Sequence, residues 1–544
     1  MNRAILFLLI TGLSVAGCKD GLEDAKKNIK DYPETQSWWE ERVFYQLFVR
    51  SFYDSDGDGN GDLQGVIEKL DYLNDGNPST EDDLGVTALM LMPVFQATGY
   101  DGYDVEDYLK IDPDYGTTED LNRLLEEAQV RGIRVVIDFP VNQTSIQHAW
   151  FTKSASSDPV FKNWYVWRNN NPGDYSPYGG PLWHPSGSEY YYGLFGSGKP
   201  DLNFKNEEVT VEIKKITEYW INQTGVSGFR MEGAGALIEE GDNILYSEST
   251  LNWWRDYFGF VRKADPSFLL VGDVPGLTTI VESYADDRLD FCYEYELSSA
   301  IFNGIKNQEA SVIREKMIDV INRYPTRQYG VFLTNQFQNR TIDILDNSEQ
   351  AKAAAGVLLT LPGVPFIYYG EEIAMKGGGM IQEARRPMQW SAQPNAGFST
   401  GSPWYPVDSD FIRNNTEGLS GDENSILSHY KKLIKIRQGS PALKKGGFEP
   451  VKSNDASVLA FFRTLGSDVV LVVQNLSSRT ITDPALSGSD GSQAAATYSG
   501  VYLTTQGAAP DLIIQGGGGF VSYSPAQELT PYSTTIIRFS RKEQ

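Results

Sequence analysis

Eight short β-rich runs alternate with helical patterns along most of this chain, and this alternation is the strongest constraint on its fold. The runs are apolar and rich in β-branched and aromatic residues, as buried strands are. They lie at residues 42–52, 86–94, 132–141, 225–232, 267–275, 289–296, 329–337 and 364–372. Helical patterns such as 118–132 and 208–225 fall between them. Eight strands with intervening helices predict a (β/α)8 TIM barrel, with functional residues at the carboxyl ends of the strands.

Two segments depart from the alternation. Residues 142–205, between the third and fourth runs, are rich in Trp, Tyr, Gly and Pro and too long for one connecting helix, so we expect an inserted domain. After residue 445 the helical pattern stops, and alternating apolar runs predict a C-terminal antiparallel β-sandwich over 446–544. The barrel is therefore expected over 37–141 and 206–445.

The first residues have the pattern of a secretory signal. One early Arg is followed by an apolar run and then by small residues, and the run is too short for a stable membrane span. The sequence "VAGC" ending at Cys18 resembles the bacterial lipoprotein processing box. We therefore expect residues 1–17 to be removed and Cys18 to be lipidated, with a plain cleaved signal as the alternative. Residues 18–36 are polar and read as a tether. This predicts a lipid-anchored protein of the cell envelope, at the outer membrane or cell surface, with the membrane as a partner.

Charge and composition restrict the other partners. A net charge of −25 and a pI near 4.6 argue against nucleic acid and against anionic lipid surfaces. The aromatic content of 12% suits neutral sugars, whose apolar faces stack on rings. The alternative is that the acidity only keeps a large secreted protein soluble. The second cysteine, Cys292, lies in an apolar run, so no intramolecular disulfide is expected after processing.

The predicted strand ends carry a series of polar motifs. These are "DFPVNQ" (138–143), "GFRME" (228–232), "VGDV" (271–274) and "NQF" (335–337), together with "GYDVEDY", "KPDLNF" and "RRPMQW". In this order they resemble the α-amylase family, glycoside hydrolase family 13, over nearly all of residues 37–544, and the loop described below points to its oligoglucosidase/neopullulanase-like branch. The resemblance implies starch or maltooligosaccharides as ligands. It also implies retaining hydrolysis by an Asp nucleophile, a Glu acid/base and a second Asp.

The same resemblance shows that the catalytic positions have changed. Glu232 stands at the nucleophile position, Asp273 at the acid/base position and Phe337 at the third carboxylate position. Three histidines of the family's central sugar subsite are replaced by Asp101 and two glutamines. The resemblance places substrate binding at Arg230, Tyr103, Asp138, Gln143, Asn335 and Gln336.

These substitutions predict weak or absent catalysis. A retaining mechanism needs its two carboxylates ~5–5.5 Å apart across the scissile bond. Glu for Asp and Asp for Glu shift that pair relative to the sugar, and a displacement of about 1 Å costs on the order of 100-fold in rate. Phe337 removes transition-state stabilisation that is typically worth a further two to three orders of magnitude. We therefore predict an α-glucan-binding protein with impaired catalysis.

Other hypotheses remain open at this point. The exchanged carboxylates could form an active retaining α-glucan hydrolase. The pocket could be remodelled for another substrate, because Gln143 and Gln336 still donate hydrogen bonds. Phe337 could merely plug the barrel mouth. The chain could also be a non-catalytic interaction protein, like the transporter heavy chains that the family includes, and partners in a glycan-uptake system are a related hypothesis.

The loop "DSDGDGNGD" (54–62) predicts a Ca2+ site, because side-chain oxygens alternate along a flexible glycine-rich backbone. It resembles the first three ligand positions of an EF-hand, but Gly65 occupies the twelfth position and we expect no entering helix before it. It is similar instead to the calcium loop of the oligoglucosidase-like branch. That resemblance implies that four carboxylates bind through their side chains, those of Asp54, Asp56, Asp58 and Asp62. It also implies that Asn60 binds through its backbone carbonyl. An acidic turn without an ion is the alternative.

Overall fold

The computed structural model describes residues 37–285, 287–324, 328–345, 347–488, 495–516 and 518–542. The predicted signal peptide (1–17), the tether (18–36) and the lipidation site Cys18 lie outside these residues. Among the helices of the described ranges, none combines the length and apolarity that a membrane crossing requires.

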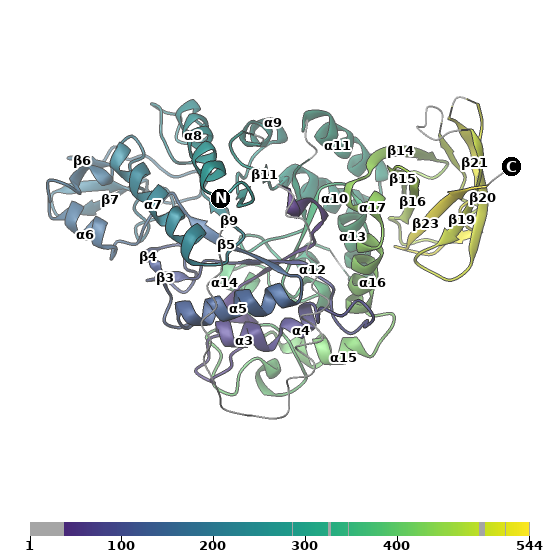
Figure 1. Cartoon of the computed structure of the whole chain (residues 1–544), viewed down its shortest axis with the longest axis horizontal. Helices are drawn as coiled ribbons and strands as arrows, with labels where there is room; N and C mark the ends of the chain where they lie inside the picture. Colours follow the sequence, from purple (N-terminus) through teal and green to yellow (C-terminus); the bar gives the residue numbers. More distant parts are fainter. Residues whose placement is uncertain are drawn as a thin grey trace, which may run out of the picture.

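A closed barrel of parallel strands forms the centre of the molecule (Figure 1). Its strands are β1 (Phe44–Leu47), β2 (Ala88–Leu91), β5 (Arg134–Pro140), β9 (Gly228–Glu232), β10 (Leu269–Gly272), β11 (Phe291–Cys292), β12 (Gly330–Phe332) and β13 (Val364–Tyr368). They are hydrogen-bonded in the order β11-β10-β9-β5-β2-β1-β13-β12, and a parallel bridge between Tyr293 and Gly330 closes the ring. Each of the eight predicted runs contains one of these strands, so the predicted barrel is confirmed.

Large apolar side chains fill the barrel interior. Phe44 of β1 stacks on Phe366 of β13 with ring centroids 4.5 Å apart, and both rings are buried. Trp38 and Trp39, from the 3-10 helix η1 (Trp38–Glu41), belong to the same buried cluster. Close approach of neighbouring strands requires a glycine at Gly228, where an added Cβ would lie 2.4 Å from the Leu269 carbonyl oxygen. The interior is therefore a packed core, as expected for this barrel.

Helices surround the barrel and connect its strands (Figure 1). They are α2 (Val49–Phe52), α3 (Leu63–Glu68), α4 (Leu70–Leu73), α5 (Thr118–Val130), α7 (Glu207–Gln223), α8 (Glu248–Ala264), α9 (Thr278–Val281), α10 (Tyr295–Asn307), α11 (Ala310–Arg323), α12 (Thr341–Ile344), α13 (Ser348–Thr360), α14 (Ile381–Ala384), α15 (Thr416–Ser420), α16 (Ile426–Gln438) and α17 (Pro441–Lys445). Helix α5 shows how the sequence sets a boundary, because Thr117 and Asp120 form a reciprocal capping box at its start. Its apolar face, which includes Leu121 and Leu124, is buried.

The segment between β5 and β9 carries a small sheet of its own. It contains α6 (Ala149–Ala155), η2 (Lys162–Trp164) and the antiparallel strands β6 (Trp167–Arg168), β7 (Trp183–Ser186) and β8 (Glu189–Tyr192), in the order β6-β8-β7. Figure 1 shows this unit at the side of the barrel opposite the C-terminal sheet. A second short pair, β3 (Phe95–Ala97) with β4 (Val105–Ile111), lies after β2. An insertion after the third barrel strand is thus present, as predicted.

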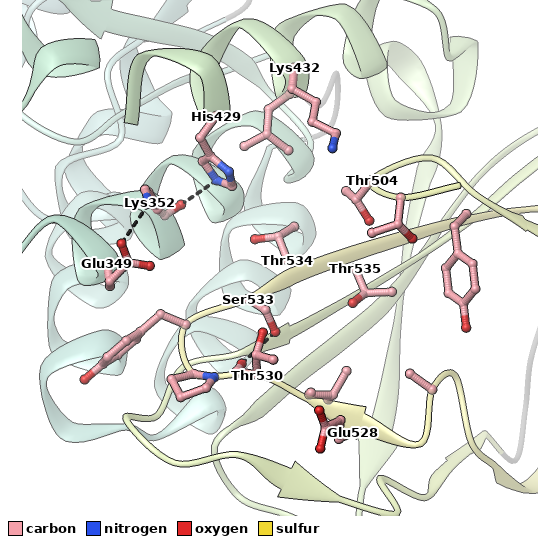
Figure 2. A pocket seen from close by; sticks show the side chains of 17 residues that line it. Glu349, Lys352, His429, Lys432, Thr504, Glu528, Thr530, Ser533, Thr534 and Thr535 are labelled. Carbon is pink, nitrogen blue, oxygen red and sulfur yellow. Dashed lines mark hydrogen bonds and ion pairs between the residues drawn. The ribbon is translucent and has the colours of Figure 1, made fainter. Parts of the chain in front are cut away.

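The C-terminal part is antiparallel. Its strands are β14 (Gly447–Ser453), β15 (Val458–Leu465), β16 (Asp468–Asn475), β17 (Ile481–Thr482), β18 (Leu486–Gly488), β19 (Ala496–Tyr502), β20 (Ala508–Ile514), β21 (Phe520–Tyr523), β22 (Glu528–Leu529) and β23 (Thr534–Arg541). Eight of them form one sheet, β20-β19-β23-β16-β15-β14-β18-β21, and β17 pairs with β22. Side chains from both ends of the sheet, such as Leu512 and Phe520, share one core, so the sheet folds onto itself. Between this part and helices α13 and α16 lies a hollow (Figure 2).

Two adjacent buried carboxyl groups follow β13, in the 3-10 helix η4 (Glu371–Ile373). Tyr45 and Tyr72 each donate a 2.7 Å hydrogen bond to Oε1 of Glu372. Tyr430 of α16 donates to Glu371 at 2.8 Å. These bonds join β1, α4 and α16 to the end of β13. Burial raises the pKa of Glu371 to about 7, while its hydrogen bonds act in the opposite direction.

This buried group predicts a pH dependence of stability. The pKa of Glu371 is higher in the folded than in the unfolded chain, so its contribution to stability is complete at acidic pH and is lost as the pH rises toward about 7. Glu371→Gln does not titrate. The free energy of unfolding of this variant minus that of the parent should therefore increase, by on the order of 2 kcal/mol, between pH 4.5 and pH 8. The variant thus becomes more stable relative to the parent as the pH rises.

Urea denaturation at several pH values measures this difference. Glu417→Gln on the exposed surface of α15 is the matched control and should follow the parent at every pH. A constant difference between Glu371→Gln and the parent from pH 4.5 to 8 would contradict the assignment.

Candidate active site

The predicted catalytic and binding residues converge at the carboxyl ends of the barrel strands. Asp138 lies in β5, Glu232 ends β9, Asp273 follows β10, and Asn335 to Phe337 follow β12. The three carboxylates are at most 6% exposed, whereas Phe337 is 42% exposed. The site is thus a buried polar network with one aromatic ring open to solvent.

Arg230 of β9 is the centre of this network. Its Nη1 donates to Oδ2 of Asp138 at 2.6 Å, and its Nη2 donates to Oδ2 of Asp273. Tyr103 also donates to Oδ2 of Asp138, at 2.7 Å. All four side chains are buried. A buried cation held by two carboxylates is costly to disrupt, because removing one member leaves the others uncompensated.

Asp273, at the predicted acid/base position, has both oxygens occupied. Oδ2 accepts from Arg230, and Oδ1 accepts from the hydroxyl of Tyr295 at the start of α10. The Tyr295 hydroxyl in turn accepts from Nδ2 of Asn335 at 3.3 Å. A general acid must present an O–H to the leaving group. In this arrangement each oxygen of Asp273 already accepts one hydrogen bond from a protein group.

Glu232, at the predicted nucleophile position, has a different environment. Its Oε2 accepts from Nε2 of Gln143 at 3.1 Å, and the same nitrogen contacts the Tyr103 carbonyl oxygen at 3.0 Å. Burial raises the pKa of Glu232 to about 7, although the charge of Arg230 lowers it. Near neutral pH a large fraction of this carboxyl group is therefore protonated, whereas a carboxylate nucleophile must be ionised.

Gln336 is fully buried and supports its neighbours. Its Oε1 accepts from Nε2 of Gln46 in β1, and its Nε2 donates to the Tyr103 hydroxyl at 2.8 Å. Both polar atoms of the Gln336 side chain are thus hydrogen-bonded to other protein side chains. The substrate-binding role of Gln336 stays a prediction. Gln143 differs, because its buried Oε1 has no hydrogen-bond partner in the described part of the chain. Gln143 therefore contacts Glu232 and also has a buried carbonyl oxygen that accepts no hydrogen bond from the described residues.

Two guanidinium groups lie close to the ring of Phe337. The Cζ atoms of Arg230 and Arg385 are 5.9 and 5.5 Å from its ring centroid. The Tyr103 ring is 5.4 Å away, and the Phe337 N–H donates to Oδ1 of Asn335 at 3.0 Å. Cations near an aromatic face are attracted to its quadrupole, which favours this ring position. The ring is thus fixed by its contacts with the protein and still presents a large surface to solvent.

Asp101, at a position where the resemblance implies a histidine, is paired with two cations. Nη1 of Arg385 and Nζ of Lys199 lie 3.2 and 3.4 Å from its Oδ2. Arg385 also donates from Nε to the Gln336 carbonyl oxygen at 3.1 Å. The acidic replacement is therefore neutralised within the protein.

Sequence reasoning missed three residues of this site: Tyr295, Gln46 and Arg385. Arg385 had a signal, because it belongs to the quoted motif "RRPMQW". Tyr295 lies at the end of a predicted strand run, but its partner Asp273 is 22 residues away. Gln46 is separated from Gln336 by 290 residues, so no local pattern connects them.

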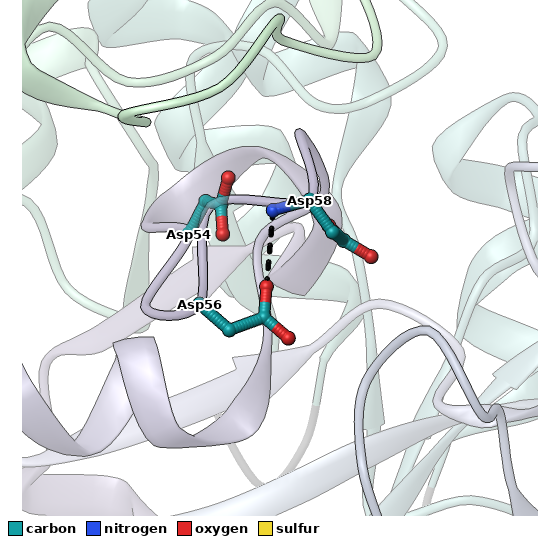
Figure 3. Close-up of side chains that lie close together, drawn as sticks. All are labelled: Asp54, Asp56 and Asp58. Atoms are coloured by element: carbon teal, nitrogen blue, oxygen red, sulfur yellow. Dashed lines mark hydrogen bonds between the residues drawn. The ribbon is translucent and has the colours of Figure 1, made fainter.

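The predicted calcium loop brings three carboxylates together (Figure 3). Asp54, Asp56 and Asp58 each offer one oxygen, and these atoms lie within 4.8 Å of one another. Asp56 accepts from the backbone N–H of Asp58 at 3.1 Å. Three carboxylates at such separation repel one another unless a cation lies between them, and an all-oxygen donor set fits Ca2+.

The other two predicted ligands differ in their contacts. Asp62 is outside this cluster and caps α3, accepting from Gly65 N–H at 2.6 Å and from Ser55 N–H at 2.8 Å. Asn60 Oδ1 accepts from Arg50, which leaves its predicted backbone ligand role untested. The structure therefore groups three of the five predicted calcium ligands by their side chains.

Comparisons with known proteins agree on one family. The sequence model of the family described as "Alpha amylase, catalytic domain" matches residues 46–446. Alpha-amylase 3 of Dictyoglomus thermophilum is 37% identical over 455 residues, which cover 81% of this chain and 86% of that protein. Oligo-1,6-glucosidase of Heyndrickxia coagulans is 30% identical, covering 82% and 93%. The crystal structure of an α-amylase from H. orenii is similar with a TM-score of 0.79 and 34% identity, over 91% of this chain and 99% of that one. With its barrel, its insertion and its series of strand-end motifs, the chain belongs to the α-amylase family.

Proposed function

We propose that this protein binds α-glucans, such as starch-derived maltooligosaccharides, at the mouth of its barrel and cleaves them slowly or not at all. The position of Phe337 carries the proposal. An exposed aromatic ring, close to the guanidinium groups of Arg230 and Arg385, stands where the resemblance places a carboxylate. The names of the relatives, an α-amylase and an oligo-1,6-glucosidase, support an α-glucan as ligand.

The surrounding carboxylates support the loss of catalysis. Asp273 is one methylene shorter than the Glu that the resemblance places there, and both of its oxygens accept hydrogen bonds from protein groups. Glu232, whose pKa burial raises to about 7, is poorly suited to act as an ionised nucleophile. Phe337 supplies no charge to the oxocarbenium-like transition state. Each defect alone slows the reaction, and together they oppose every chemical step of the family mechanism.

One observation favours a second candidate, an active hydrolase with exchanged carboxylate roles. The environments of Glu232 and Asp273 differ, and in known sites such differences separate the acid from the base or nucleophile. Glu232 would then donate the proton and Asp273 would attack. Turnover would fall as the pH rises through about 7, since Glu232 loses its proton there, and Glu232→Gln would abolish it. A pH-independent or absent rate excludes this candidate.

Restoring the family residues tests the main proposal. The triple change Glu232→Asp, Asp273→Glu, Phe337→Asp should gain α-glucan hydrolysis over the parent by on the order of 100-fold or more, measured as reducing ends released from maltoheptaose. The new carboxylate at position 337 would lie near two guanidinium groups, which favours its ionised form. Single restorations should gain little, because the three groups act together.

The matched control combines Glu232→Asp and Asp273→Glu with Phe337→Asn. Asn has a similar size to Asp but carries no charge. It should remain close to the parent in rate. A folded triple variant that gains no hydrolysis, or an Asn control that gains as much as the Asp variant, would contradict the account of Phe337.

We also propose that the loop at 54–62 binds one Ca2+. Asp54, Asp56 and Asp58 would supply side-chain oxygens, and the bound ion would stabilise the connection between β1 and α3. The ion would have a structural role away from the carboxylates of the barrel mouth. The close grouping of the three acidic side chains supports this proposal.

Melting with and without a chelator measures the effect of the ion. Ca2+ at 100 times its dissociation constant should add about 2.7 kcal/mol of stability, and Asp58→Ala should remove most of this gain. Asp256→Ala, an exposed acidic position on α8, is the control and should keep the calcium response. Equal melting temperatures for the parent with calcium and with chelator would show that the loop acts without an ion.

We further propose that Cys18 is the acylated first residue of the mature protein and anchors it to the cell envelope. The support is the "VAGC" sequence after an apolar run. Attachment at the outer membrane or cell surface would place the glucan site beside the components of a glycan-uptake system. Two or more acyl chains are needed for stable attachment.

Intact-mass analysis of membrane-extracted protein tests this anchor. The expected mass is that of residues 18–544 plus the lipid, and Cys18→Ser should yield protein without lipid mass. A mature chain that begins at another residue and carries no lipid would overturn the proposal.

A further inference from the structure

A second hollow, of about 510 Å³, lies away from the barrel mouth. Helices α13 and α16 form one side, and the loop after β19 with the strands β22 and β23 forms the other (Figure 2). None of the residues assigned above to catalysis, sugar binding or calcium lines it. Its volume falls within the range of roughly 300–1,000 Å³ that is usual for ligand pockets, and it lies at a junction between domains, where such sites are common.

Hydroxyl groups dominate the sheet side of this hollow. Thr504, Thr530 and Thr535 line it together with Thr505. Within the described ranges, the hydroxyls of Thr505, Thr530 and Thr535 make no hydrogen bond to protein. In Figure 2, Thr504, Thr530 and Thr535 lie around the same space. Each free hydroxyl can both donate and accept, which matches the hydroxyls of a sugar.

The charges around the hollow nearly cancel. Lys352 pairs with Glu349 at 2.7 Å, and Glu528 lies on the side opposite Lys432. Burial lowers the pKa of His429 to about 4, so this ring is neutral at physiological pH. Lys432 makes no ion pair with any described residue and remains available as a donor. The site therefore suits a neutral polyhydroxylated ligand better than a multiply charged anion.

Tyr502 gives the hollow one fixed aromatic surface, whereas Tyr532 is only 8% exposed and belongs to the hydrophobic core. The hydroxyl of Tyr502 donates to the Pro525 carbonyl oxygen at 2.6 Å. The hydroxyl of Tyr532 accepts from Nε2 of Gln350 in α13 at 3.2 Å. Rings that are held at their outer ends lose little conformational entropy when a ligand packs on them.

We propose that this hollow is a second carbohydrate site, which holds a segment of an α-glucan while another part of the chain reaches the barrel mouth. The ligand class rests on the proposed function, but the site itself does not require the mouth. Lys432 and the threonine hydroxyls donate to sugar oxygens, and the Tyr502 ring supports a sugar face. Two sites on one chain strengthen attachment to a polysaccharide by raising the effective concentration at the second site.

Calorimetry with maltoheptaose and affinity electrophoresis in gels that contain glycogen test this proposal on the full chain. The variant Lys432→Ala, Thr535→Val removes two donors. It should reduce retention on glycogen by on the order of fivefold to tenfold and lower the stoichiometry from two oligosaccharides to one. Lys435→Ala, on the same helix but paired with Glu81 outside the hollow, is the matched control and should behave as the parent.

Phe337→Ala separates the two sites. If the mouth also binds glucan, this variant loses that site and keeps the one that depends on Lys432. If the proposed function of the mouth is wrong, Phe337→Ala binds as the parent does, and the loss with Lys432→Ala, Thr535→Val still establishes the second site. Lys432→Ala alone repeats the test should the double variant fold poorly. Unchanged stoichiometry and retention in a folded variant would overturn the proposal, as would binding of inorganic phosphate in preference to maltoheptaose.

Discussion

The two ion pairs of Arg230 are the interaction on which the barrel mouth depends. They join β5, β9 and the residue after β10 in a region from which water is excluded. Both terminal nitrogens of the guanidinium hold a carboxylate, so Asp138 and Asp273 are fixed in place before any ligand enters. A buried cation with two acidic partners leaves little freedom for its neighbours.

The predicted exchange of the two carboxylates would have a physical consequence in this setting. Asp273 is held by Arg230 and by the hydroxyl of Tyr295, while Glu232 receives one hydrogen bond from an amide. Phe337 covers the same guanidinium from the solvent side. The result is a buried polar network beneath an exposed ring. We propose that such a surface holds a sugar, while Arg230, Asp138 and Asp273 are paired with one another within the protein.

Much of the fold could be predicted from the sequence, because strand and helix periodicities are local properties. The eight barrel strands and the order of the motifs at their ends follow from such patterns. The connections within the site could not be predicted in the same way. Gln46 and Gln336 meet across 290 residues, and Tyr295 reaches Asp273 only because α10 begins beside β10. The cap that Asp62 provides to α3 had a local signal, an Asp directly before a helix, yet the calcium pattern suggested a ligand instead.

The most direct test of this account uses the unmodified protein. Calorimetry should detect binding of maltoheptaose, and analysis of the same sample after prolonged incubation should recover the oligosaccharide intact. Binding without cleavage is the result that a fixed Arg230 network beneath Phe337 predicts. Hydrolysis at ordinary enzyme rates, roughly 1–1,000 per second, would contradict it.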